Sequence, residues 1–277
     1  MVSAGPTDGK PIVLLHGFPD AWFLYERQIK FLADRGYRVI VPDQRGYNKT
    51  GKPAGISSYR VDLLVEDIIA LLNHLKLDRV DLVGHDWGAA VAWMVALQHP
   101  ERLKSLGIIN VPHPLVFKKF IGTEPRQMMR SWYFGFFLIP FLPEFLLSLN
   151  NFAAMLAKKG SLNEEERRRA IDAWRQPGAL TAMLNWYRAA ILNRPELRGD
   201  GEIDLPVLIL WGKRDPYLIH EMAAESLGFC PRGRLELLEN AGHWPMLDES
   251  DLLNKLLLEF LTGDGADSDA AFEEDLN

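Results

Sequence analysis

The chain has 277 residues, of which 48% are hydrophobic and 25% charged, a composition typical of a globular protein and unlike that of a disordered or fibrous one. Its single cysteine, Cys230, excludes an internal disulfide framework and any zinc or iron–sulfur site built from several cysteines. The formal net charge of −6 argues against nucleic acid as the main partner.

The negative charge is concentrated at the end of the chain. Of the 37 acidic residues, six lie from residue 264 onward, where there is no Lys or Arg, so the preceding residues carry 31 acids and 31 bases. Residues 263–277 also lack core-forming side chains, and we expect an acidic disordered tail there. The acidic surplus therefore carries no information about the substrate.

Short apolar runs alternate with amphipathic stretches along most of the chain. The runs are brief, rich in β-branched residues and bounded by turn residues, which predicts buried strands at Ile12–Leu15, Tyr37–Val41, Val80–Val83, Leu106–Ile109, Val207–Trp211 and Leu235–Leu238. Helical periodicity is found at Val61–Leu75, about Gly88–Gln98 and Leu252–Leu261. This alternation predicts an α/β fold with a mostly parallel sheet covered on both faces.

The alternation stops between about residues 112 and 205, where a charged helical pattern and many aromatic residues occur without a convincing strand. We therefore expect a core in two parts, 1–112 and 206–262, with an all-helical cap inserted at 113–205. Within the cap, Trp132–Leu149 is very apolar but is interrupted by two prolines and Glu144, whereas a membrane-spanning helix needs ~20 apolar residues. We expect buried or cavity-lining helices there, with contact to a membrane surface or a partner as the alternative.

The motif Gly84-His85-Asp86-Trp87-Gly88 lies between a predicted strand and a predicted helix. Glycines at both ends allow a tight turn that presents the middle side chain above the sheet, as in a nucleophile elbow. The nucleophile here is Asp86 rather than serine. The alternative is an ordinary loop aspartate that caps the helix.

Two further residues complete a catalytic triad in the chain order of α/β-hydrolases. Asp215 lies in WGKRDPY after one predicted strand, and His243 lies in NAGHWP after the next. The HGFP motif follows the first predicted strand and forms a turn that can point the Phe18 backbone N–H toward the site. Together with the backbone N–H of Trp87, the residue after the nucleophile, it is the expected oxyanion hole. His16, in the same motif, is interpreted as a structural residue.

These motifs resemble the α/β-hydrolase superfamily and, within it, the epoxide hydrolase branch. The resemblance covers about residues 2–262 and rests on HGFPD, PDQRGY, GHDWGA, NVPHP, WGKRDPY and NAGHW. Relatives usually begin with an antiparallel pair of strands. Here that opening is reduced to Met1–Ala4, so we expect a shortened first edge of the sheet.

An aspartate nucleophile narrows the chemistry. A carboxylate that attacks an ester forms an anhydride, a poor intermediate, whereas attack on an sp³ carbon gives an alkyl ester that water can hydrolyse. Epoxides and haloalkanes are the two obvious substrate classes, and an opening epoxide needs a general acid. By resemblance, Tyr133 and Tyr187 match the two cap tyrosines that fill this role in the epoxide hydrolase branch.

We therefore expect an epoxide hydrolase that forms a vicinal diol through a covalent aspartyl ester. The alternatives are a haloalkane dehalogenase with the same nucleophile and a non-catalytic ligand-binding member of the fold. The substrate should be a small apolar epoxide in a pocket lined by Trp22, His113, Phe134, Trp186, Trp244 and Met246. Neither a cofactor nor a metal site is indicated, since the sequence has no nucleotide- or zinc-binding motif.

The first ten residues lack the apolar region of a signal peptide, so the sequence predicts a soluble, cytoplasmic protein without a stable membrane anchor. The sequence does not decide whether the chain forms a homodimer through the cap.

Overall fold

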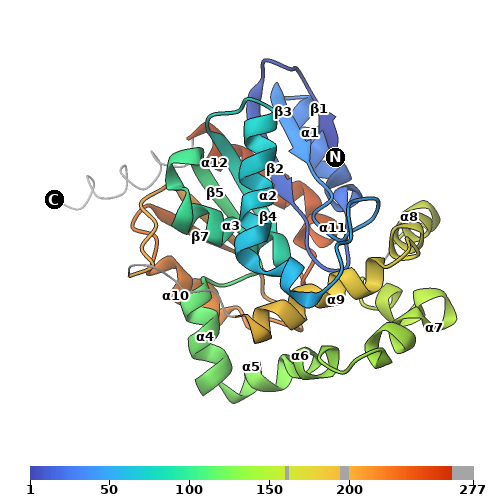
Figure 1. Cartoon of the computed structure of the whole chain (residues 1–277). Helices are drawn as coiled ribbons and strands as arrows, with labels where there is room; N and C mark the ends of the chain where they lie inside the picture. The colour runs from blue at the N-terminus through green and yellow to red at the C-terminus, as the bar shows by residue number, and fades with distance from the viewer. Residues whose placement is uncertain (160–161, 194–199, 264–277) are drawn as a thin grey trace.

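The computed structural model describes residues 1–159, 162–193 and 200–263. Within them, seven strands form one sheet in the order β1-β3-β2-β4-β5-β6-β7 (Figure 1). The strands are β1 (Val2–Ala4), β2 (Lys10–Leu15), β3 (Tyr37–Val41), β4 (Val80–His85), β5 (Leu103–Ile109), β6 (Val207–Gly212) and β7 (Gly233–Leu238). Only the short edge strand β1 is antiparallel to its neighbour in this sheet. The predicted fold class and shortened first edge are confirmed.

Helices cover both faces of the sheet, which explains why the central strands are apolar on both sides. α2 (Val61–His74) and α3 (Trp87–Gln98) pack on one face, whereas α1 (Glu26–Ala33) and α12 (Ser250–Thr262) pack on the other. The remaining core helices are α10 (Glu221–Leu227), α11 (Pro245–Asp248) and the short 3-10 turns η1 (Trp22–Tyr25), η2 (Ile56–Tyr59) and η3 (Pro100–Arg102). In β2, residues Ile12 to Leu15 are completely buried, as expected for a strand between two helical layers.

Six helices lie between β5 and β6 in the described part of the chain, and we call them the cap. They are α4 (Pro114–Thr123), α5 (Pro125–Arg130), α6 (Trp132–Phe137), α7 (Leu142–Leu156), α8 (Glu164–Trp174) and α9 (Ala179–Leu192). In Figure 1, α9 crosses directly below the core and α5–α7 form the outermost layer. The exact division into domains at residues 113 and 205 stays a prediction, and the predicted tail lies outside the described residues from 264 onward.

The expectation that residues 132–149 are buried or line a cavity is wrong for much of this segment. Phe137 is buried, but Trp132 is 68% exposed and Phe141 is 84% exposed. The reason is the position of α9, which is enclosed by η2, α2 and the other cap helices. The outer helices α6 and α7 can each cover α9 with one face only, which leaves their other face in solvent. Within the described residues, no helix is long and apolar enough to cross a membrane.

Candidate active site

Asp86 lies on a sharp turn between β4 and α3. Its backbone has φ 50° and ψ −126°, an unusual conformation for a residue other than glycine. A Cβ on Gly84 would lie 2.4 Å from the Gly88 carbonyl oxygen, and a Cβ on Gly88 would lie 2.1 Å from the Leu15 carbonyl oxygen. Both glycines are therefore required because the backbone passes too close for any side chain.

The carboxylate of Asp86 has two oxygens in different surroundings. Oδ1 accepts a hydrogen bond of 2.6 Å from the Phe18 backbone N–H, whereas Oδ2 lies 3.4 Å from Nε2 of His243. Burial raises the pKa of Asp86, but His243, His85 and the Trp87 backbone N–H outweigh it and lower the pKa below its usual value. The predicted nucleophile is thus held as a carboxylate, and the two predicted oxyanion-hole N–H groups both reach it.

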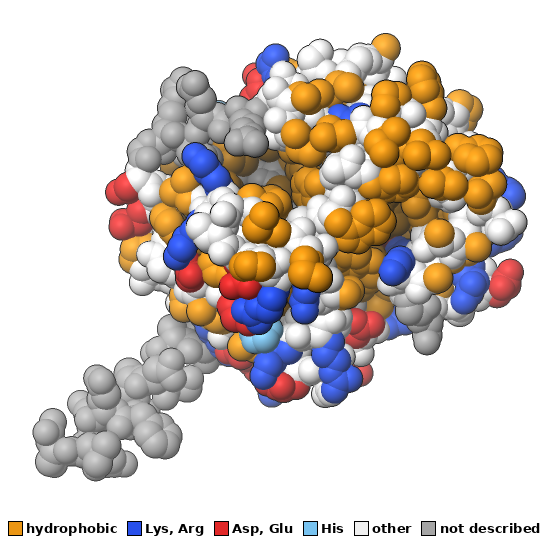
Figure 2. Space-filling model, turned by 90° about the horizontal axis from the view of Figure 1, so that it is seen from below, with side chains coloured by type: hydrophobic (Ala, Val, Ile, Leu, Met, Phe, Trp, Pro, Cys, Tyr) orange, Lys and Arg blue, Asp and Glu red, His pale blue; other side chains and the backbone are white. Residues whose placement is uncertain are grey.

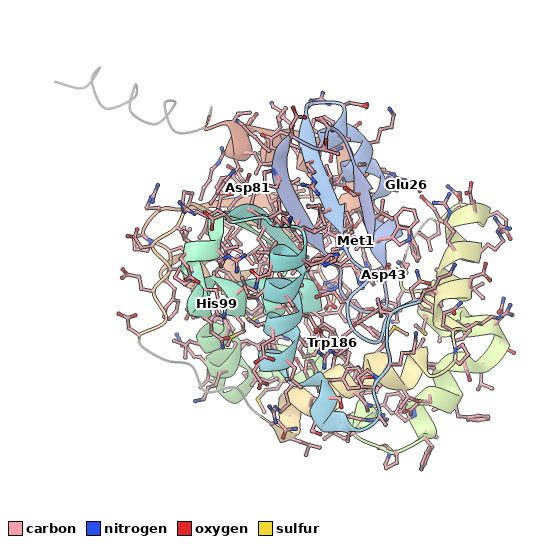
Figure 3. The ribbon with its side chains drawn as sticks, turned by 45° about the horizontal axis from the view of Figure 1, so that its top comes forward. Met1, Glu26, Asp43, Asp81, His99 and Trp186 are labelled. Carbon is pink, nitrogen blue, oxygen red and sulfur yellow. The ribbon has the colours of Figure 1, made fainter. Side chains whose placement is uncertain are left out.

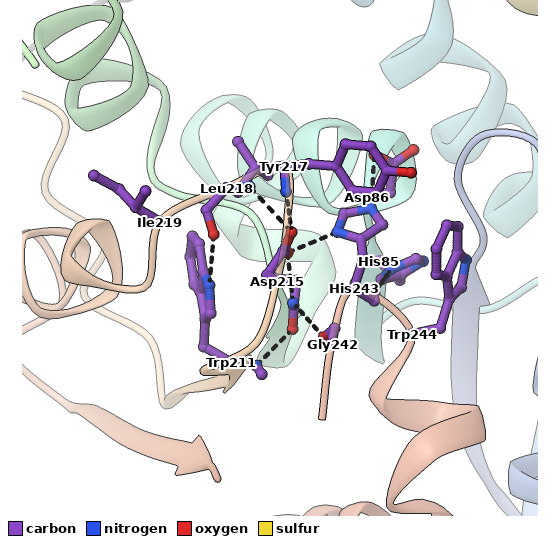
Figure 4. Close-up of polar contacts among 12 residues, drawn as sticks. His85, Asp86, Trp211, Asp215, Tyr217, Leu218, Ile219, Gly242, His243 and Trp244 are labelled. Atoms are coloured by element: carbon purple, nitrogen blue, oxygen red, sulfur yellow. Dashed lines mark hydrogen bonds and ion pairs between the residues drawn. The ribbon is translucent and has the colours of Figure 1, made fainter. Parts of the chain in front are cut away.

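The three predicted triad residues come together at the carboxyl ends of β4, β6 and β7 (Figure 4). Nδ1 of His243 lies 2.7 Å from Oδ2 of Asp215, so one imidazole connects both carboxylates. The side chain of Asp86 is 16% exposed, while those of His243 and Asp215 are almost completely buried. Burial lowers the pKa of His243, but the charges and hydrogen bonds of Asp215 and Asp86 outweigh this and raise it to about 10.

The orientation of Asp215 is fixed by three donors that were not predicted from the sequence, two backbone N–H groups and one side chain. The backbone N–H groups of Tyr217 and Leu218 donate to Oδ1 over 2.7 and 3.0 Å. Nδ2 of Asn110 donates to Oδ2 over 2.7 Å, and its Oδ1 accepts from the Gly212 N–H. Asn110 follows β5 directly, and a polar residue at the carboxyl end of a strand is a signal that could have identified it.

The two predicted cap tyrosines lie side by side above the nucleophile. The rings of Tyr133 on α6 and Tyr187 on α9 are 6.0 Å apart in an edge-on arrangement. Burial and the nearby charge of Asp86 raise the pKa of both phenols well above 10, so both are neutral donors at pH 7. The ring of Trp87 packs edge-on against Tyr187, with 5.0 Å between the ring centroids. The structure therefore places two neutral phenols close enough to the Asp86 carboxylate to be affected by its charge.

Arg188, a second residue without a predicted role, fixes the relative positions of the helices that carry these tyrosines. It follows Tyr187 on α9 and donates through Nε to the Phe137 carbonyl at the end of α6 over 2.8 Å. Its Nη1 also forms a 2.7 Å ion pair with Glu144 at the start of α7. One buried guanidinium thus connects α6, α7 and α9.

Three of the predicted pocket residues lie close to the site. Phe134 is in ring contact with both cap tyrosines, and Trp244 is in ring contact with His243. Trp186 lies between the cap and the core (Figure 3), where its ring contacts Trp87 and its Nε1–H donates to the Arg45 carbonyl.

The other three are placed elsewhere. Trp22 donates its backbone N–H to Asp43 and borders a surface cleft near α1. His113 caps α4 and stacks on Phe229, and Met246 is buried in the hydrophobic cluster beside α12. Within the described residues, none of the three has a hydrogen bond or ring contact with the triad or the cap tyrosines. Strand-end motifs can place a loop at the site, but they do not show which way each side chain turns.

Two further features near the site were not predicted. Tyr217 is in ring contact with both His243 and Tyr133, so it contributes to the wall of the site. Asp20 pairs with Lys159 of the cap in a fully buried contact, and its second oxygen accepts the Trp244 indole N–H over 2.9 Å. Further along the same two segments, Arg169 of α8 pairs with Glu26 of α1, which is labelled in Figure 3. Both ion pairs connect the cap to the core.

The fold and the arrangement of the triad agree with a comparison of the sequence with known protein families. The family model for the alpha/beta hydrolase fold matches residues 10–250. The chain belongs to this family. With the AB hydrolase superfamily protein YfhM of Bacillus subtilis (strain 168) it is 43% identical over 268 residues, which cover 94% of this chain and 93% of the relative.

Other relatives place the chain in the epoxide hydrolase branch of the family. It is 37% identical to human Epoxide hydrolase 4, over 94% of this chain and 74% of that protein. Among solved structures, Bacillus megaterium epoxide hydrolase in complex with an inhibitor superposes with a TM-score of 0.86 at 30% identity, covering 94% of this chain and 95% of that one. The motifs that suggested the branch are thus supported over nearly the whole chain.

Proposed function

We propose that this protein hydrolyses small apolar epoxides to vicinal diols through an ester on Asp86. The observation that carries the proposal is the placement of two neutral phenols, Tyr133 and Tyr187, beside a carboxylate that is held ionised. A carboxylate next to two proton donors suits a substrate whose electrophilic carbon carries an oxygen leaving group.

In the first step, Oδ2 of Asp86 attacks one ring carbon of the epoxide. Oδ1 is occupied by the Phe18 N–H, so Oδ2 is the oxygen with an electron pair available toward the pocket. The C–O bond of the ring breaks as the new C–Oδ2 bond forms. The electron pair passes to the ring oxygen, which takes a proton from one tyrosine while the other donates a hydrogen bond.

In the second step, His243 removes a proton from water, and the water oxygen attacks Cγ of the ester. The negative charge that develops on Oδ1 is stabilised by the Phe18 and Trp87 N–H groups. The Phe18 N–H already donates to this atom in the free enzyme, and the Trp87 N–H already lowers the pKa of the same carboxyl group. The Cγ–Oδ2 bond then breaks, and the diol leaves with Oδ2 and the proton from His243. The second proton of the water, left on the new Asp86 carboxyl, passes to the tyrosinate formed in the first step, which restores both residues.

The charge state of Asp86 coordinates the two steps. While it is ionised, Asp86 supplies part of the raised pKa of His243, which keeps the imidazole protonated. Esterification removes this negative charge, so the pKa of His243 falls. The imidazolium then releases its proton to solvent and the neutral imidazole becomes available as a base. We infer that His243 is activated by formation of the intermediate itself.

No observation favours the haloalkane dehalogenase alternative. A leaving halide needs N–H donors, whereas the donors that both lie within the influence of the Asp86 charge are two phenols, Tyr133 and Tyr187. The non-catalytic alternative is disfavoured because the triad is assembled: Nδ1 of His243 lies 2.7 Å from Asp215, and its Nε2 lies 3.4 Å from Asp86.

Two assays on the same preparation test the proposal. Styrene oxide should be converted to its diol by the wild-type protein and not by freshly prepared Asp86→Asn, whereas 1-bromobutane should release no bromide. Bromide release without diol formation would establish the dehalogenase, and binding of styrene oxide without turnover would establish the ligand-binding alternative.

A further inference from the structure

The outer layer of the cap carries a large exposed apolar surface. We call it the cap apolar face, and its most exposed members are Met128, Met129, Trp132, Ile139, Phe141 and Phe145, between 44% and 84% exposed. Figure 2, seen from the side of the cap, shows hydrophobic side chains gathered over a broad area with Lys and Arg at its borders. Soluble monomers rarely expose a continuous apolar area above a few hundred Å², and larger patches mark interaction sites.

The unpaired charges around this face are basic, because Glu124 and Glu144 both lie in ion pairs with arginines. Residues 125–159 contain a single acid, Glu144, and that carboxylate is largely buried in its ion pair with Arg188. Arg130 and Lys158 are exposed within the same stretch, and Lys118 is exposed on the adjacent α4. Among the described residues, none of these three cations forms an ion pair. The apolar face therefore has an uncompensated basic border.

We propose that the cap apolar face docks reversibly on an anionic lipid surface. Bulky aromatic side chains surrounded by Lys and Arg match the boundary between acyl chains and acidic headgroups. A second copy of this chain fits less well, because an isologous dimer would bring the same basic border against itself.

The cap apolar face is also directly connected to the candidate active site. On α6, Trp132 is exposed, whereas the next residue, Tyr133, contacts Tyr187 and Tyr217 over the nucleophile. The width of α6 alone thus separates the lipid-facing side from the site. If the proposed function holds, docking would present the enzyme to apolar epoxides dissolved in the bilayer; the docking itself does not depend on that function.

Flotation with vesicles tests the docking without any turnover. Wild-type protein should bind vesicles of phosphatidylcholine and phosphatidylglycerol (7:3), with weaker binding to phosphatidylcholine alone and at high salt. Trp132→Ser/Phe141→Ser should reduce binding at least tenfold, and Lys118→Glu/Lys158→Glu should remove the preference for the anionic lipid. The matched control, Leu237→Ser/Leu252→Ser, changes two apolar side chains of the core that are 39% and 40% exposed and should bind like wild type.

Failure to bind either vesicle would overturn the proposal, as would equal binding by Trp132→Ser/Phe141→Ser and wild type. Analytical ultracentrifugation of the same samples identifies the competing occupant. A wild-type dimer that becomes monomeric in Trp132→Ser/Phe141→Ser would show that a second copy covers the face, and this too would overturn the proposal. Circular dichroism of each variant checks that it is folded, and diol formation from dissolved styrene oxide reports separately on the proposed function.

Discussion

Gly17 is the residue whose replacement tests the site geometry most sharply outside the triad. A Cβ at this position would lie 2.3 Å from both Cβ and Oδ1 of Asp86 and 2.7 Å from its Cγ. The clash involves Asp86 Cβ, which is fixed by the backbone of the elbow, so a change of rotamer cannot relieve it. In Gly17→Ala, the HGFP loop and the nucleophile must therefore move apart.

The size of the effect follows from these distances. Ordinary van der Waals contact begins at about 3.4 Å, so the two groups must separate by roughly 1 Å, and a displacement of this size at a reacting group costs about 10²-fold in rate. The same movement disturbs the 2.6 Å bond from the Phe18 N–H to Oδ1. We expect kcat/KM for styrene oxide to fall by about 10²-fold or more, equivalent to about 2.7 kcal/mol of transition-state stabilisation.

The matched control is Gly122→Ala on α4, where a new Cβ has no neighbour within 4 Å. This variant should keep wild-type activity and gain slightly in stability, because alanine favours a helix over glycine. Thermal unfolding of both variants shows whether the fold is retained. A folded Gly17→Ala enzyme with kcat/KM within threefold of wild type would refute the reasoning about the elbow.

Three other predictions follow from contacts in and beside the site. The pKa of His243, measured by NMR, should be well above 6.5 and should fall in Asp86→Ala; an unchanged value would contradict the proposed activation. Since the folded-state pKa is raised to about 10, the stability that His243 contributes is fully present below pH 6.5 and is lost as the pH rises toward 10. Tyr187→Phe should slow ester formation by about 10²-fold without slowing ester hydrolysis, as followed by stopped-flow tryptophan fluorescence, and equal losses in both steps would refute its role as an acid. Lys159→Met leaves the buried carboxylate of Asp20 without its cation and should cost about 3–5 kcal/mol in urea unfolding, most of it restored by adding Asp20→Asn; full stability of the single variant would show that the pair is dispensable.

The sequence predicts the core of this protein well because its signals are local. Each strand is a short apolar run bounded by turn residues, and the structure extends the predicted runs by at most a few residues, as when β4 continues to His85. The order of Asp86, Asp215 and His243 along the chain is itself informative, because parallel strands bring their carboxyl ends to one edge.

The contacts that complete the site are not local, and this explains why they were missed. Asn110 reaches Asp215 across 105 residues, and Lys159 reaches Asp20 across 139. No periodicity in the sequence connects such pairs. The composition of residues 132–149 shows that the segment is apolar, but which side faces solvent depends on the position of α9.

The origin of the oxygen in the product tests the ester mechanism most directly. In a single turnover with excess enzyme in H₂¹⁸O, the water oxygen should enter the carboxylate of Asp86, and the diol should leave with an unlabelled oxygen from that residue. Mass spectrometry of the diol and of the peptide that contains Asp86 measures both. The account predicts labelled Asp86 and unlabelled diol in the first turnover, whereas labelled diol with unlabelled Asp86 would show that water attacks the epoxide directly and would contradict the central claim.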